Sequence, residues 1–101
     1  MNEAAQTAIF SDLAGAHIIL TGGGQGIGEA MVRAFAAQGS TVHFCDLDAE
    51  RGEKLAAEIE LAIFTSVDLR KETEVVEWLE GVTSAHSGKI KALINNAACD
   101  P

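Results

Sequence analysis

Short apolar runs alternate along the chain with longer stretches in which apolar residues recur at helical spacing. The apolar runs predict buried β-strands at residues 17–20, 41–45, 61–67 and 89–94. The stretches between them predict α-helices at residues 27–37, about 49–60 and 71–86. Because strands that alternate with helices form parallel sheets through crossover connections, the pattern predicts an α/β fold. We expect a Rossmann-type, doubly wound parallel sheet with strand order 3-2-1-4.

The periodicity also predicts which side of each helix packs on the sheet. The expected inward residues are Ile27, Ala30, Met31, Ala34 and Phe35 in the first helix, Leu55 and Ile59 in the second, and Val75, Leu79 and Val82 in the third. Trp78 is expected to flank the third set. Gly39 is predicted to end the first helix, and Asp48 to cap the start of the second. The third helix is expected to be poorly capped at its start, by Arg70.

Acidic residues outnumber basic ones, 15 Asp and Glu against 7 Lys and Arg, and the formal net charge is −8. This balance argues against a nucleic-acid or anionic-membrane partner. It also means that backbone dipoles, rather than cations, would hold a bound phosphate. No apolar run approaches the roughly 20 residues of a membrane span, and residues 1–10 lack the basic region of a signal peptide. We therefore expect a cytoplasmic protein.

The cysteines and histidines form no recognisable motif by their spacing. Cys45 and Cys99 match neither a disulfide framework nor a metal-ligand pattern, so we expect both to be small apolar fillers. His17, His43 and His86 have no matching partners in the sequence, and we expect them to be structural or solvent-facing. No metal site is predicted.

A glycine-rich turn, Thr21-Gly22-Gly23-Gly24-Gln25-Gly26-Ile27-Gly28, joins the first predicted strand to the first predicted helix. The free N–H groups and aligned dipoles of a helix N-terminus favour anions such as phosphate. Glycines let the backbone come close to the ligand and adopt positive φ. A glycine run alone is more typical of a flexible turn, but this one lies between a strand and an amphipathic helix. The arrangement therefore indicates a nucleotide phosphate site.

Polar residues follow the other three predicted strands, at Asp46, Asp68 and Asn95-Asn96. Ligands of doubly wound sheets bind outside the carboxyl ends of the strands. Asp46 follows the glycine turn by about 20 residues, as an acid that binds the adenosine ribose does. Its carboxylate would repel a 2′-phosphate, so we expect NAD to be preferred over NADP. The alternatives are that Asp68 only caps a turn and that the two asparagines only form one.

These residues resemble motifs of the short-chain dehydrogenases/reductases. The glycine turn resembles the family's TGxxxGxG turn, and Asn95-Asn96-Ala97-Ala98 resembles its NNAG motif, with Ala98 in place of the usual glycine. The resemblance covers essentially the whole chain. It implies an NAD-dependent oxidoreductase that transfers hydride between a nicotinamide and an alcohol or carbonyl. The cofactor-binding residues that it implies are Gly22, Gln25, Gly26, Ile27, Gly28, Asp46, Leu47, Asp68, Leu69, Asn95 and Ala97.

The family's catalytic serine, tyrosine and lysine lie beyond the region that this chain resembles, and the sequence contains no tyrosine. We therefore expect residues 1–101 to be the NAD-binding half of a Rossmann-type domain, truncated after the fourth strand and inactive alone. The apolar fourth strand, with Ala92, Leu93 and Ile94, is expected to form an exposed edge that favours self-association. The alternatives are a non-catalytic nucleotide-binding or oligomerising module and a truncated methyltransferase.

Overall fold

The computed structural model describes residues 13–24, 26–87 and 89–96 of the chain. Strands and helices alternate through this part, as β1 (His17–Thr21), α2 (Gly26–Ala37), β2 (Thr41–Asp46), α3 (Ala49–Glu58), β3 (Ala62–Ser66), α4 (Glu72–Ala85) and β4 (Ile90–Asn95). The strands form one parallel sheet in the order β3-β2-β1-β4. The predicted α/β fold and strand order are therefore confirmed, and the predicted element bounds are right to within two residues.

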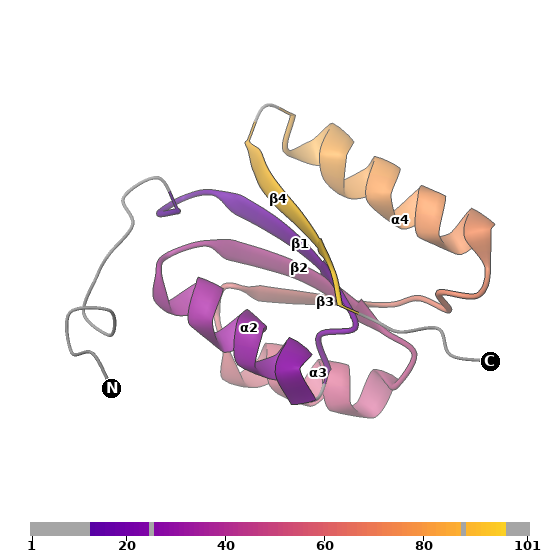
Figure 1. The fold of residues 1–101 in the computed structure, drawn as a ribbon, viewed down its shortest axis with the longest axis horizontal. Helices are drawn as coiled ribbons and strands as arrows, with labels where there is room; N and C mark the ends of the chain where they lie inside the picture. Colours follow the sequence, from indigo (N-terminus) through magenta and orange to yellow (C-terminus); the bar gives the residue numbers. More distant parts are fainter. Residues whose placement is uncertain (1–12, 25, 88, 97–101) are drawn as a thin grey trace.

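The helices cover the sheet on both faces, with α2 and α3 on one side and α4 on the other (Figure 1). Each face has its own apolar core, because successive residues of a strand point to opposite sides. Leu20 of β1 packs with Val42, Phe44 and Leu55 toward α2 and α3. Ile19, its neighbour in sequence, packs instead with Cys45, Val67 and Trp78 toward α4.

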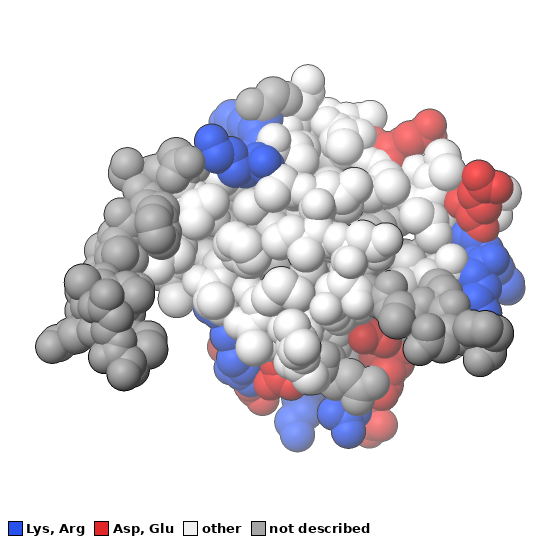
Figure 2. All heavy atoms as spheres, viewed as in Figure 1, with Lys and Arg blue, Asp and Glu red and all other residues white. Residues whose placement is uncertain are grey.

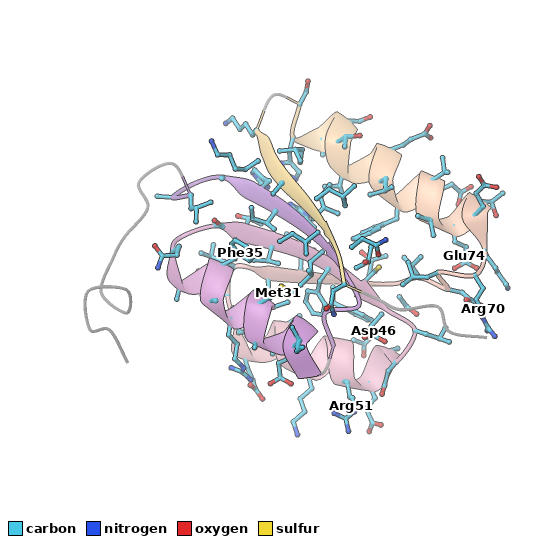
Figure 3. All side chains as sticks on the ribbon, in the orientation of Figure 1. Met31, Phe35, Asp46, Arg51, Arg70 and Glu74 are labelled. Carbon is cyan, nitrogen blue, oxygen red and sulfur yellow. The ribbon has the colours of Figure 1, made fainter. Side chains whose placement is uncertain are left out.

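The inward face of α2 differs from the prediction by one residue. Gly28 and Val32 are buried, and Met31, Phe35 and Ala36 are partly buried against the same core. Figure 3 shows Met31 and Phe35 pointing from the helix toward the sheet. The predicted spacing is present, but Ile27 is 73% exposed, and Ala30 and Ala34 are also exposed. The prediction overlooked glycine at the inward position, where the helix comes close to the glycine turn.

The prediction for α4 was wrong about its tryptophan. Trp78 is the buried residue of this helix and belongs to the core beneath it, with Val75, Leu79 and Val82 around it. A large ring at the centre of a helical stripe removes more apolar area from water than at its border. The expected cap of α3 is confirmed, because Asp48 accepts a hydrogen bond from the Arg51 amide. The start of α4 is poorly capped, as expected, but its N-cap residue is Lys71 and not Arg70.

Cys45 is fully buried in the sheet, and burial raises the pKa of its thiol to about 11. The thiol therefore stays protonated near neutral pH and packs as a small apolar group, as expected. Cys99 lies outside the described residues. None of the described helices combines the length and the hydropathy that a bilayer crossing requires.

The three histidines contradict the expectation that they have no partners. They lie together at the α4 side of the sheet, and Nδ1 of His17 is 2.9 Å from Nε2 of His43. The His17 ring stacks on the His86 ring with a centroid separation of 3.9 Å. Spacing along the sequence could not indicate this cluster, because its members come from β1, β2 and the end of α4.

Candidate functional site

The glycine turn leaves the carboxyl end of β1 and is tied to the neighbouring strand β2. The amides of Gly22 and Gly23 both donate to the carbonyl of Cys45, at 2.8 and 3.2 Å. Gly22 and Gly26 have positive φ values of 72° and 64°, a conformation that L-residues with a side chain rarely adopt. The backbone path of the turn therefore requires glycine at these two positions.

Asn96 holds the end of β4 against this turn. Its side-chain amide donates to the Gly22 carbonyl at 2.9 Å, and its backbone amide donates to the hydroxyl of Thr21 at 3.0 Å. That hydroxyl in turn donates to Oδ1 of Asn95 at 2.8 Å. A Cβ added at Gly28 would overlap the Gly22 carbonyl and lie 2.8 Å from Nδ2 of Asn96. The turn, the start of α2 and the end of β4 are thus packed together without space for another methyl group.

Asp46, at the end of β2, has a carboxylate whose two oxygens are both oriented by backbone amides. Oδ2 accepts from Gly24 at 3.1 Å, and Oδ1 accepts from Asp48 at 3.0 Å. Each carboxylate oxygen retains lone-pair capacity for a further donor. Leu47 follows it on the surface and is exposed. Asp46 is therefore a fixed anionic acceptor beside the glycine turn (Figure 3).

Asp68, after β3, is held by contacts within its own loop. Its Oδ1 accepts from the backbone amide and Nε of Arg70, and its Oδ2 accepts from the guanidinium NH2 group, each at 3.0 Å. These hydrogen bonds from Arg70 lower the pKa of Asp68. The Asp68 amide donates to Glu74 of α4, and Leu69 packs on the core beneath that helix. The geometry fits the turn-capping alternative and leaves a direct ligand role for Asp68 a prediction.

A cavity of about 380 Å³ lies between α2 and α3 and reaches the turn at Gly24. Its walls are mostly charged, with the cations Arg33, Arg51 and Lys54 among them. Arg33 is paired with Glu29 at 3.0 Å and with Glu58 at 2.7 Å. None of the polar strand-end residues lines it. We therefore interpret this cavity as a groove between two helices that is bordered by ion pairs, and not as the main ligand cleft.

The structure brings most of the predicted site residues to one edge of the sheet. Gly26 and Ile27 begin α2 and are exposed, so the first N–H groups of that helix, which have no intrahelical partners, face this edge. Asp46 and Asn95 lie at the ends of the strands on either side of β1. Gln25 and Ala97, also predicted, lie outside the described residues, as does Ala98.

Three contacts of this edge were not predicted from the sequence. They are the Thr21 hydroxyl that joins the ends of β1 and β4, the Arg70 clamp on Asp68, and the Glu74 carboxylate that accepts from the Asp68 amide. The Thr21 contact could have been suspected, because a hydroxyl residue comes directly after the apolar run 18–20. Arg70 lies two residues from Asp68, so local charge pairing was the signal for the second.

A parallel β3-β2-β1-β4 sheet, with a glycine turn after β1 and an acid after β2, defines a Rossmann-type nucleotide-binding fold. The family model described as short chain dehydrogenase matches residues 16–101. The chain therefore belongs to the short-chain dehydrogenase family, as its motifs indicated. This assignment excludes the methyltransferase alternative.

Curated relatives include several sugar dehydrogenases. The chain is 39% identical over 94 residues to an L-fucose dehydrogenase of Bos taurus, covering 93% of this chain and 34% of that protein. It is 43% identical over 96 residues to a probable galactose dehydrogenase of Rhizobium meliloti, covering 90% of this chain and 37% of that protein. The chain thus spans about a third of the length of these relatives.

Solved structures agree with this family. A 3-ketoacyl-(acyl-carrier-protein) reductase from Brucella melitensis, complexed with NADH, has a TM-score of 0.72 at 34% identity, covering 80% of this chain and 33% of that one. A metagenomic short-chain oxidoreductase in complex with NADP has a TM-score of 0.79 at 30% identity, covering 87% of this chain and 41% of that one. Relatives with this fold therefore include complexes with either dinucleotide.

Proposed function

We propose that the edge formed by the glycine turn, Asp46 and the end of β4 binds the adenosine diphosphate part of a nicotinamide dinucleotide. The observation that carries the proposal is the close packing of Gly28 against Gly22, which brings the exposed start of α2 beside a fixed carboxylate. The helix N-terminus supplies amides for the pyrophosphate, and Asp46 supplies acceptors for ribose hydroxyls. The chain is then the cofactor-binding part of an oxidoreductase.

Asp46 favours NAD over NADP in this proposal. The carboxylate is fixed by the Gly24 and Asp48 amides, so it cannot turn away from a 2′-phosphate without losing both hydrogen bonds. Two negative charges at 4 Å repel by up to roughly 4 kcal/mol at an effective dielectric of 20. Hydrogen bonds from ribose hydroxyls to a carboxylate contribute about 1.5–3 kcal/mol. Both effects act in the same direction.

The proposal assigns cofactor binding to these residues and no turnover. In the family that the motifs resemble, a tyrosine donates the proton during carbonyl reduction. The sequence of residues 1–101 contains no tyrosine. Hydride transfer between the nicotinamide and an alcohol or carbonyl is proposed for a protein that also holds the catalytic serine, tyrosine and lysine. We assign no catalytic residue within 1–101.

Titration with NADH tests the site, using calorimetry on wild type and on a matched pair of alanine variants. Gly26 and Gly15 both have positive φ, and a Cβ at either would meet no atom within 4 Å. Gly26→Ala and Gly15→Ala should therefore each destabilise the fold by a similar amount, about 1 kcal/mol. Gly26→Ala should weaken NADH binding about tenfold, since its methyl group stands at the start of α2, whereas Gly15→Ala should not.

Absence of wild-type binding at millimolar NADH would contradict the proposed cofactor site. Equal weakening in the two variants would show that binding follows stability alone, and would remove Gly26 from the site. The thermal melting temperature of each variant, measured in the same buffer, provides the comparison of stability.

We also propose that the chain self-associates through β4. This strand pairs only with β1 among the described strands, and Leu93 on it is 57% exposed. The view onto this edge in Figure 2 shows a broad central area without charged side chains, where Figure 1 places β4 between α4 and α2. Lys91, which is exposed on the same strand, opposes pairing, but the unpaired edge around Leu93 is apolar and favours pairing with another chain.

Leu93→Lys is expected to shift the protein toward monomer, because a charge on an exposed edge strand opposes pairing. The matched control is Ile63→Lys on β3, the opposite edge of the sheet, where the native side chain is 46% exposed. Sedimentation velocity at micromolar concentration measures the result. A monomeric wild type, or the same loss of association in both variants, would contradict a role for β4.

A further inference from the structure

The histidine cluster lies at the opposite end of the sheet from the glycine turn. His17 is the first residue of β1, His43 lies in β2, and His86 caps the C-terminal end of α4. His43 pairs in register with Ile19, which packs toward α4, so its ring is on the α4 face. β1 rises about 3.3 Å per residue, which separates His17 from Thr21 by roughly 13 Å. The cluster is therefore independent of the proposed cofactor site.

The three rings come close enough to share one ligand. One nitrogen of each ring lies within 4.8 Å of the corresponding nitrogens of the other two. For His17 and His43 the separation is already 2.9 Å. Two nitrogens bound to one tetrahedral zinc at about 2.0–2.1 Å are separated by roughly 3.3 Å. His86, stacked on His17 and only partly buried, is the ring that must turn about its side-chain bonds.

The ligand chemistry selects a transition metal. A site of three imidazoles suits Zn²⁺, Cu²⁺ or Ni²⁺, whereas Mg²⁺ and Ca²⁺ require oxygen ligands. His43 is buried, and Nδ1 of His17 lies 2.9 Å from its Nε2, so the two rings are already placed to share an ion. The Lys89 ammonium near His17 repels a bound cation, whereas the formal net charge of −8 attracts one.

We propose that His17, His43 and His86 form a three-histidine Zn²⁺ site, with the fourth position left to water. Three protein ligands plus one open position is a known zinc arrangement. The bound ion connects β1, β2 and the end of α4. Its effect is therefore expected on the stability of the fold and not on dinucleotide binding.

The test uses the chain without any polyhistidine tag. Calorimetric titration with ZnCl₂ should show one ion per chain, and Zn²⁺ in excess should raise the melting temperature by about 5–10 °C, reversed by EDTA. MgCl₂ should do neither. His86→Gln should weaken Zn²⁺ binding at least tenfold, because it removes a ligand from the partly exposed end of α4. The matched control Ser84→Gln introduces the same residue two positions away and should bind as wild type does.

A second pair of measurements distinguishes this histidine site from Zn²⁺ binding by the cysteines and from an effect on the cofactor site. A chain with Cys45→Ala and Cys99→Ala should retain Zn²⁺ binding, and NADH affinity should be equal with and without Zn²⁺. Loss of binding in the cysteine variant, or equal binding by wild type and His86→Gln, would overturn the proposal. So would the absence of both heat and a melting shift in wild type.

Discussion

Replacing Gly28 with alanine is expected to lower the free energy of unfolding by about 3 kcal/mol. The added Cβ would overlap the carbonyl oxygen of Gly22 and lie 2.8 Å from Nδ2 of Asn96. Both neighbours are fixed, since the asparagine amide donates to that carbonyl. α2 must therefore move away from the turn, which loosens the contacts of Val32 with the core. The urea midpoint, followed by the fluorescence of Trp78, should fall by about 2 M.

The same substitution at Gly81 is the matched control for this prediction. Gly81 lies in the interior of α4, and a Cβ there would meet no atom within 4 Å. Gly81→Ala should therefore raise stability by roughly 0.5–1 kcal/mol, because alanine has the higher helix propensity. The two variants are expected to shift the midpoint in opposite directions. If both variants shift the urea midpoint in the same direction, or if Gly28→Ala does not shift it, the predicted clash of a Cβ at Gly28 with the Gly22 carbonyl would be wrong.

The fold could be predicted because its signals are local. Four apolar runs of strand length and three helical periodicities predicted the parallel sheet. Its strand order followed from the expected Rossmann-type arrangement. Cap chemistry located two helix limits. Asp48 caps the start of α3 by accepting from the Arg51 amide, and Gly39, with a φ of 89°, follows the end of α2. The bounds were right to within two residues because each limit depends on a few neighbouring side chains.

The register of α2 could not be predicted by the same reasoning. Two sets of positions in this helix recur at helical spacing: 27, 30, 31, 34 and 35, and the same set shifted by one residue. The prediction chose the first set, which begins with the larger residue Ile27. The structure instead places Gly28 inward, since only a residue without Cβ can approach the Gly22 carbonyl. Close backbone approach thus decides the orientation of the helix, and hydrophobicity scales give glycine no weight for it.

The candidate site was predictable in its outline and not in its contacts. Strand ends meet at one edge of a parallel sheet, so Asp46 and Asn95 could be placed there from topology alone. The bond between Asn96 and Gly22 joins residues 74 positions apart, and the histidine cluster begins with a contact 26 positions apart. Such pairings depend on side-chain orientation after the layers have packed. Neither periodicity nor spacing carries that information.

Replacing Asp46 with asparagine is expected to narrow the preference for NADH over NADPH by about 100-fold. Asparagine removes the negative charge and keeps one acceptor oxygen, so it can accept from only one of the Gly24 and Asp48 amides. Ribose hydroxyls then donate to a neutral acceptor, which weakens NADH binding about tenfold. NADPH no longer meets a like charge near its 2′-phosphate, so its affinity should rise by about tenfold or more at moderate salt. Parallel calorimetric titrations with the two cofactors measure the ratio.

Asp48→Asn separates this effect from a general loss of acidic charge near the turn. Asp48 lies two residues further on, caps α3 through the Arg51 amide, and can be replaced by asparagine with little cost, because the two residues cap equally well. The control should leave the ratio of NADH to NADPH affinity within about twofold of wild type, since its carboxylate is directed at the helix. Equal changes in the two variants, or an Asp46→Asn variant that loses affinity for both cofactors alike, would refute the ribose role of Asp46. The proposal of a dinucleotide site would then depend on the glycine turn alone, which the Gly26→Ala titration tests separately.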